Sequence, residues 1–185
     1  MIYGKLTLQD WHNVHVMGEA PESSFESPDL RIFFYGTIYN RDLLPISPDD
    51  SNAKIVAELD VEDSELGFSR LDGSFTIVYY SKDYCGIVRD HHGTHSPVYY
   101  TSDGDFATSW QHLQESAGVP FGYHPISLSS FLQRGIMDKE HFAVSGICCL
   151  HAGEYLKMDC RGSLYGGQLI KHIPKIVIEN NSDPE

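Results

Sequence analysis

The sequence predicts an α+β domain in which antiparallel strands are followed by helices that pack on the sheet faces. Three observations predict it. Short apolar runs separated by turn residues are concentrated in the middle of the chain, which is typical of antiparallel strands. Runs with helical spacing and capping residues follow them. The 185 residues, 41% of them hydrophobic, are enough for one domain with its own core.

The N-terminal part is predicted to hold two strands separated by a loop. Residues 2–8 alternate weakly between apolar and polar side chains and are expected to form the first strand. Residues 18–29 are rich in Ser, Glu and Pro, which predicts a mobile loop. Residues 30–36, LRIFFYG, are typical of a short buried strand, which Gly36 is expected to end.

A short helix is predicted after residue 50. Residues 37–50 are expected to form a turn or a single helical turn, because two prolines near their end prevent a longer helix. The apolar residues of the segment 51–60 then lie on one helical face. Either Asp50 or Ser51 can cap the N-terminus of this helix.

The middle of the chain is predicted to form an antiparallel meander. In residues 75–80 both sets of alternating side chains are apolar or aromatic, which indicates a strand covered on both faces. Residues 85–90 are expected to return as the next strand, and residues 97–101 to form a third. Residues 102–104, Ser-Asp-Gly, are a hairpin signal before a further strand at 105–109.

Two helices and a region of mixed structure are predicted after the meander. Ser109 can cap the first helix. Ser127 can cap the second, and Gly135 can end it in a left-handed conformation. Short strands and turns are expected over residues 136–178. We therefore expect one domain over residues 1–178, and a polar tail or the start of a linker over 179–185.

Charge and composition exclude several classes of partner. The net charge of −13 would repel a polyanion, so no nucleic-acid partner is expected. No run of 18 apolar residues is present, and the N-terminus lacks the pattern of a signal peptide, so we expect no membrane association and a cytoplasmic location. The four cysteines form no CxxC pair, which leaves a zinc ribbon without support.

The stretch RDHHGTHSPVYY, residues 89–100, holds three histidines within five positions. A metal site would need the imidazoles to converge on one point. Adjacent residues at a strand end point in opposite directions, so His91 and His92 are not expected to share a metal. A glycine and a proline in the stretch favour a turn. We expect no metal here, and we expect Arg89 and Asp90 to form a structural or interfacial pair that orders the turn.

The central sequence resembles the glutaminase domain of class II (Ntn-type) glutamine amidotransferases, in particular the asparagine synthetase and β-lactam synthetase branch. That branch carries the patterns LDGxFAF, RDxxGxxPLYY and FASE. They match residues 71–75, residues 89–100 and Phe106-Ala107 in order, with one residue more between Gly93 and Pro97 than in the family pattern. Outside this region, residues 35–44 are similar to the NGEIYNYxEL of the family, and residues 152–159 to its PPGxYLxxD.

The resemblance implies a four-layer α/β/β/α sandwich with antiparallel sheets, the Ntn-hydrolase-like fold. It also implies a known chemistry, in which an N-terminal cysteine attacks glutamine and its own α-amine acts as the general base. The family opens Met-Cys-Gly-Ile, whereas this chain opens Met-Ile-Tyr-Gly, so Ile2 stands in place of the nucleophile. The resemblance implies no cofactor.

Other parts of the glutaminase site are also changed. The Asn-Gly pair that supplies the oxyanion hole in the family corresponds to Tyr35 and Gly36, and the acidic residue after it corresponds to Thr37. The aspartate that binds the substrate ammonium corresponds to Asn52. An uncharged amide holds an ammonium group much less well than a carboxylate does. We expect these four residues to line a vestigial binding pocket.

The expected function is therefore that of a catalytically inactive glutamine amidotransferase-like domain. It would be the scaffold or subunit of an ATP-dependent amide-forming enzyme, with an asparagine synthetase-like adenylating domain or subunit as partner, possible homo-oligomerisation, and a place in peptide or natural-product biosynthesis. Three alternatives stay open. They are a small-molecule or peptide binding module that uses the vestigial pocket, an active glutaminase with an unusual site, and an unrelated α+β domain.

Overall fold

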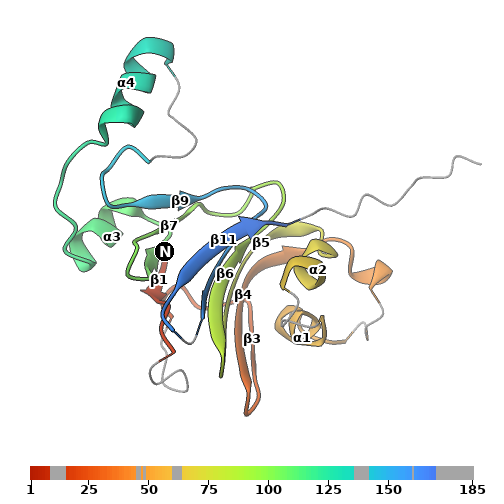
Figure 1. Ribbon diagram of the computed structural model, residues 1–185. Coiled ribbons are helices and arrows are strands. Elements are labelled where there is room, and N and C mark those ends of the chain that lie inside the picture. Colours follow the sequence, from red (N-terminus) through yellow and green to blue (C-terminus); the bar gives the residue numbers. More distant parts are fainter. Residues whose placement is uncertain are drawn as a thin grey trace, which may run out of the picture.

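The fold is a sandwich of two antiparallel sheets, seen in a computed structural model (Figure 1). The structure describes residues 1–8, 16–44, 47, 49–59, 64–135, 142–159 and 161–169, without the side chains of 64–66. Among these residues the large sheet contains, in spatial order, β11 (Leu164–Gln168), β10 (Glu154–Asp159), β6 (Tyr84–Arg89), β5 (Gly73–Ser81), β4 (Leu30–Ile38) and β3 (Ser23–Glu26). The small sheet contains β2 (Met17–Gly18), β1 (Ile2–Lys5), β8 (Asp105–Ala107), β7 (Val98–Tyr100) and β9 (Cys148–Leu150).

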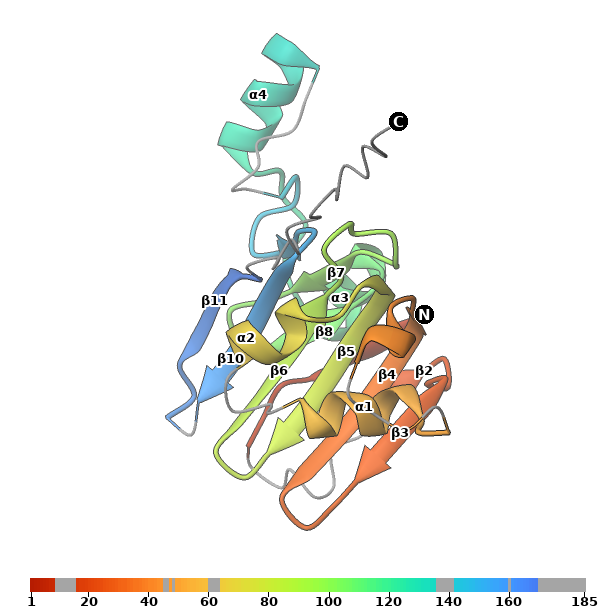
Figure 2. The ribbon, with the colours of Figure 1, turned by 90° about the vertical axis from the view of Figure 1, so that its right-hand side faces the viewer.

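Helices cover the outer faces of both sheets, which makes four layers. Helices α1 (Asn52–Glu58) and α2 (Ser64–Ser69) lie on the outer face of the large sheet (Figure 2). Helix α3 (Trp110–Ser116) packs on the small sheet through Leu113. One apolar cluster lies between the large sheet and helices α1 and α2. A second apolar cluster fills the space between the two sheets. The α+β class and the four-layer Ntn-hydrolase-like sandwich are confirmed.

The hydrophobic pattern of β5 explains its central position. Ile77 and Tyr79 face the layer under the helices, while Val78 and Tyr80 face the layer between the sheets. All four side chains are completely buried. A strand with two apolar faces is stable only where both faces are covered, as the sequence predicted.

The predicted meander is wrong at one connection. β5 and β6 form a hairpin, and β7 and β8 form another, but the two hairpins belong to different sheets. The place beside β6 is taken by β10, which begins 65 residues after β6 ends (89 to 154). Residues 90–97 therefore cross from one sheet to the other and do not join two paired strands.

Residues 18–29, predicted as a mobile loop, contain the end of β2 and the whole of β3. β3 pairs with β4 at the edge of the large sheet, and its Phe25 side chain packs against the core. A polar sequence suits an edge strand, because its other face and its free edge meet water. Gly36 also does not end its strand, since β4 continues to Ile38.

The local signals for helices are largely confirmed. The hydroxyls of Ser51 and Ser109 cap α1 and α3 by accepting a backbone N–H of the first turn. The single helical turn expected within residues 37–50 is a 3₁₀ turn, η2 (Arg41–Leu43). Helix α4 (Pro125–Arg134) ends at Gly135 in the left-handed conformation, as predicted.

The N-terminus of α4 differs from the prediction. The helix begins at Pro125, whose fixed φ suits a first helical position, so Ser127 lies inside the helix and does not cap it. The short strands expected after residue 136 are β9, β10 and β11. The tail 179–185 and Cys160 lie outside the described residues. No described helix is long and apolar enough to cross a membrane.

Candidate functional site

The positions where the family resemblance places the nucleophile and the oxyanion donor are occupied by core side chains. Ile2 begins β1 of the small sheet, and Tyr35 lies on β4 of the large sheet. Both side chains belong to the cluster between the sheets, where Ile2 is 3% exposed and Tyr35 2%. Hydrocarbon and aromatic carbon therefore fill this part of the sandwich interior.

The hydroxyl of Tyr35 is buried and has no hydrogen-bond partner in the described part of the chain. Burial, with smaller contributions from the carboxylates of Glu22 and Glu19, raises the pKa of Tyr35 to about 12. The phenol is therefore neutral at physiological pH. A buried hydroxyl without a hydrogen-bond partner lowers the stability of the folded chain, and such groups are uncommon in folded proteins.

The backbone conformation and the close neighbouring strand at position 36 require a glycine. Its φ is +110°, and a Cβ atom built on it would lie 2.1 Å from the carbonyl oxygen of Ser74 on the neighbouring strand. A side chain at this position would collide with main chain that cannot move without breaking the sheet. Thr37 follows on β4 and is exposed. The register places Thr37 opposite Ser74 and Tyr35 opposite Thr76.

The structure does not bring Asn52 together with Tyr35. Asn52 is the first residue of α1, on the outer face of the large sheet. Its side-chain oxygen accepts a hydrogen bond of 2.7 Å from the Arg41 guanidinium. Tyr35 points into the layer between the sheets. The sheet therefore separates two of the four residues expected to line one pocket.

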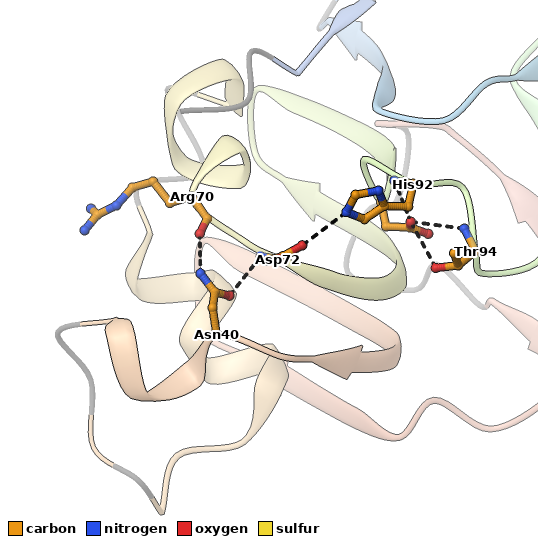
Figure 3. Close-up of polar contacts among 6 residues, drawn as sticks. Asn40, Arg70, Asp72, His92 and Thr94 are labelled. Atoms are coloured by element: carbon orange, nitrogen blue, oxygen red, sulfur yellow. Dashed lines mark hydrogen bonds and ion pairs between the residues drawn. The ribbon is translucent and has the colours of Figure 1, made fainter. Parts of the chain in front are cut away.

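Asp90 organises the crossover between the two sheets. Its side chain is 0% exposed. Its carboxylate accepts hydrogen bonds from the backbone N–H groups of His92, Thr94 and His95 and from the Thr94 hydroxyl, at 3.0 to 3.3 Å. Figure 3 shows the contacts of His92 and Thr94. Burial alone would raise the pKa of Asp90, but these N–H donors outweigh it and lower the pKa below its usual value.

Arg89 fastens the same segment to the small sheet. Its guanidinium donates to the backbone carbonyls of Gly93 and His95 within the crossover and of Leu150 on β9, at 2.8 to 3.3 Å. Asp90 thus binds backbone groups within the crossover, and Arg89 binds backbone groups both of the crossover and of β9. The structural or interfacial role expected for this pair stays a prediction.

A second set of contacts ties the crossover to the β4–η2 region. The side chain of Asn40 donates to the carbonyl of Arg70 at 2.9 Å and accepts from the N–H of Asp72 at 2.8 Å (Figure 3). The Asp72 carboxylate lies 3.5 Å from Nε2 of His92. The last pair is exposed, so it contributes little to stability.

The three histidines of the crossover have separate surroundings. His92 contacts Asp72, and Nδ1 of His95 lies 2.9 Å from Oγ1 of Thr76. The His91 ring lies beside Gly153. The described residues hold no group of three or more side chains that could bind a metal.

The three described cysteines all have raised pKa values. Burial raises the pKa of Cys85 to about 12 and also raises the pKa values of Cys148 and Cys149. A thiol attacks as its thiolate, which is scarce at neutral pH when the pKa is raised.

The sequence reasoning missed the polar groups around Tyr35, which are Glu19, Glu22, Thr76 and His95. Glu19 and Glu22 lie in the segment predicted as a mobile loop, and Thr76 looks like an ordinary strand residue. The strand register brings Thr76 beside Tyr35, and the crossover brings His95 onto Thr76. If β3 had been predicted and paired with β4, the strand register would have placed Glu22 near Tyr35 in the sheet.

Comparison with solved structures finds the same sandwich in amidotransferases. The glutamine phosphoribosylpyrophosphate amidotransferase from B. subtilis, complexed with ADP and GMP, is 14% identical, with a TM-score of 0.51. The match covers 87% of this chain and 35% of that one. A structure described as the allosteric regulatory enzyme of purine biosynthesis is also 14% identical, with a TM-score of 0.52, over 82% of this chain and 31% of that one.

These likenesses define the fold as that of Ntn-type glutamine amidotransferases. The chain spans about a third of the length of both structural neighbours. No family model and no curated protein match the sequence. At 14% identity the likeness concerns the fold alone, and it does not single out the asparagine synthetase branch.

Proposed function

We propose that this chain is a catalytically inactive glutamine amidotransferase-like domain that serves as scaffold or subunit of an ATP-dependent amide-forming enzyme. The observation that carries the proposal is the pairing of the amidotransferase fold with Ile2 and Tyr35 at the expected catalytic positions. Acyl transfer to an enzyme needs a nucleophile, and the side chain of Ile2 is hydrocarbon.

The tyrosine at position 35 adds a second obstacle to glutamine hydrolysis. An oxyanion hole works through donors fixed 2.7–3.1 Å from the developing negative charge. The Tyr35 ring belongs to the buried cluster between the sheets, and two carboxylates raise the pKa of its hydroxyl. Negative charge beside the hydroxyl opposes the formation of another anion there.

A partner is supported by an exposed apolar surface on and beside α4, called here the α4 surface. It consists of Phe121, Tyr123, Ile126, Leu128, Phe131 and Leu132, all exposed. Helix α4 stands away from the sandwich in both ribbon views (Figures 1 and 2). Its buried side chains are two serines, Ser127 and Ser130, so the usual distribution of polar and apolar residues on a surface helix is reversed.

The kind of partner follows from two considerations. In both structural neighbours this fold makes up only about a third of the chain, so it is built together with further polypeptide. The resemblance of the sequence to the synthetase branch points to an adenylating domain or subunit as that polypeptide. We assign the α4 surface to this partner, because grouped apolar side chains on a protein surface mark interaction sites.

The loss of glutaminase activity is tested with the wild-type chain and the variant Ile2→Cys. We expect neither to release ammonia from glutamine above a heat-treated control. The variant restores a nucleophile but leaves Tyr35 in place, and the N-terminal sequence is to be verified by mass spectrometry. Ammonia release by the wild-type chain would overturn the proposal. Release by the variant alone would limit the defect to the nucleophile.

The α4 surface is tested with Leu132→Asp against the matched control Leu43→Asp. Leu132 is 75% exposed and Leu43, in η2, is 77% exposed, so neither change should alter the folding of the domain. We expect Leu132→Asp to weaken binding to an adenylating protein encoded beside this chain by about tenfold or more. We expect Leu43→Asp to bind normally. Equal affinities in a calorimetric titration would refute this assignment.

A further inference from the structure

Helix α4 lacks the packing that a helix of its length needs. It has 10 residues, and isolated helices shorter than about 12–15 residues are only marginally stable in water. Its buried side chains are both serines, whereas its four large apolar side chains are exposed. Most helices in proteins are stabilised by burying their apolar face. A second surface that covers the apolar side chains of α4 would supply this packing.

The base of α4 is held in place, so the helix presents its apolar side chains away from the sandwich (Figures 1 and 2). The N–H of His124 donates to the carbonyl of Ala143 at 2.8 Å, beside an isolated antiparallel bridge between Tyr123 and Val144. The rings of Phe121 and Tyr123 meet edge to face at this base, with centroids 5.2 Å apart, and both are exposed.

The apolar side chains of α4 form a stripe that is complementary to itself. Leu128, Phe131 and Leu132 are three and four positions apart, so they lie on one face of the helix. In an antiparallel pair about a two-fold axis, Leu128 of one copy meets Leu132 of the other, and Phe131 lies near the axis. Ile126 lies on another face of the helix and takes no part in this contact.

The charge distribution allows two copies to meet at α4. The net charge of −13 makes two copies of the chain repel each other. Residues 117–135, however, contain no aspartate and no glutamate, and Arg134 is their one formal charge. The antiparallel pair keeps the two arginines at opposite ends. Because α4 stands away from the sandwich, the contact also leaves the acidic bodies of the two copies apart.

The area of the contact suits a weak, reversible dimer. Phe121, Tyr123 and Phe131 are 61%, 59% and 48% exposed. Leu128 and Leu132 are 40% and 75% exposed. With about 150–250 Å² for each aromatic side chain, the five residues offer roughly 500 Å² per copy, or about 1,000 Å² in a pair. Specific interfaces begin near this size, and those below about 1,200 Å² are mostly transient.

We propose that two copies of this chain associate through their α4 surfaces when no other protein covers them. The second copy buries the stripe of Leu128, Phe131 and Leu132. The dimer is then the resting state of the surface that we assign to the adenylating partner, and the partner must displace the second copy to bind. This last step rests on the proposed function, whereas the self-association does not.

The self-association is tested by sedimentation equilibrium of the full chain at about 1–300 µM, with a reducing agent because Cys148 is exposed. We expect the average mass to rise with concentration from that of one chain toward twice that value. Raising the salt concentration to about 0.5 M should strengthen the dimer, because salt screens the repulsion between the acidic bodies. A wild-type chain that stays monomeric over the whole range would overturn the proposal.

Two matched variants locate the contact. Leu132→Asp places a charge in the apolar stripe, and we expect it to weaken self-association by about tenfold or more. Leu43→Asp changes a leucine that is equally exposed in η2, and we expect it to dimerise like wild type. Circular dichroism verifies that both variants fold. If Leu132→Asp dimerised as well as Leu43→Asp, the contact would lie elsewhere and the proposal would fail. Partner binding is measured in a separate titration, so the two proposals can fail independently.

Discussion

Replacing Asp90 with alanine is expected to lower the free energy of unfolding by about 3–5 kcal/mol. The carboxylate is completely buried and accepts the N–H groups of His92, Thr94 and His95. Alanine would leave these donors without partners, and each buried donor left unsatisfied costs about 1–3 kcal/mol. The crossover between the sheets would also lose the side chain that sets its shape.

The measurement is urea-induced unfolding followed by circular dichroism. Asp83→Ala is the matched control, because Asp83 is exposed in the turn between β5 and β6. We expect the control to change stability by no more than about 0.5 kcal/mol. If Asp90→Ala were as stable as Asp83→Ala, the hydrogen bonds to Asp90 would not hold the crossover.

The same residue predicts a pH dependence with a definite sign. The pKa of Asp90 is lower in the folded chain than its usual value of 3.8. Asp90 therefore adds stability at pH values above its unfolded pKa, and this contribution is lost as the pH falls through the folded pKa. Between about pH 6 and pH 2 we expect the stability of wild type to fall more steeply than that of Asp90→Asn. Parallel curves for the two proteins would contradict the assignment.

Gly36→Ala is expected to destabilise the chain by about 3 kcal/mol or more. The new Cβ would lie 2.1 Å from the Ser74 carbonyl oxygen and 2.9 Å from the Phe75 Cα. Both atoms belong to the backbone of β5, which is buried and paired on both sides. The strand cannot move away without breaking its hydrogen bonds, so the clash is relieved only by distorting the large sheet.

Gly118→Ala separates the steric effect from the conformational one. Gly118 also has a positive φ, +65°, but a Cβ there would meet no atom within 4 Å. We expect Gly118→Ala to lower the free energy of unfolding by only about 1–2 kcal/mol, which is the cost of holding an alanine in the left-handed conformation. The comparison is made by thermal unfolding of both variants. Equal losses of stability would mean that the contact with Ser74 does not matter.

Local interactions made part of the fold predictable. The serine caps of α1 and α3 and the left-handed Gly135 depend on residues a few positions apart, so their signals are complete in the sequence. The burial of both faces of β5 was also predictable, because a strand with two apolar faces needs two cover layers. β3 was missed, because the edge of a sheet accepts the polar sequence of a loop.

The candidate site was predicted only in part. Tyr35 and Gly36 were named through the family resemblance, and the sequence itself shows only that residue 2 is isoleucine. The grouping of Tyr35 with Asn52 depended on which face of the sheet each residue occupies. That face is set by strand register and by the packing of α1, which one sequence does not display.

The sequence by itself determined the α+β class and most helix and strand positions in the described chain. The tertiary structure alone decided that the two central hairpins belong to different sheets, with β10 inserted beside β6. It alone also placed Thr76 opposite Tyr35 and the His95 ring on the Thr76 hydroxyl. The reason is that strand pairing joins residues far apart in the chain, and many pairings are compatible with the same local pattern of apolar residues.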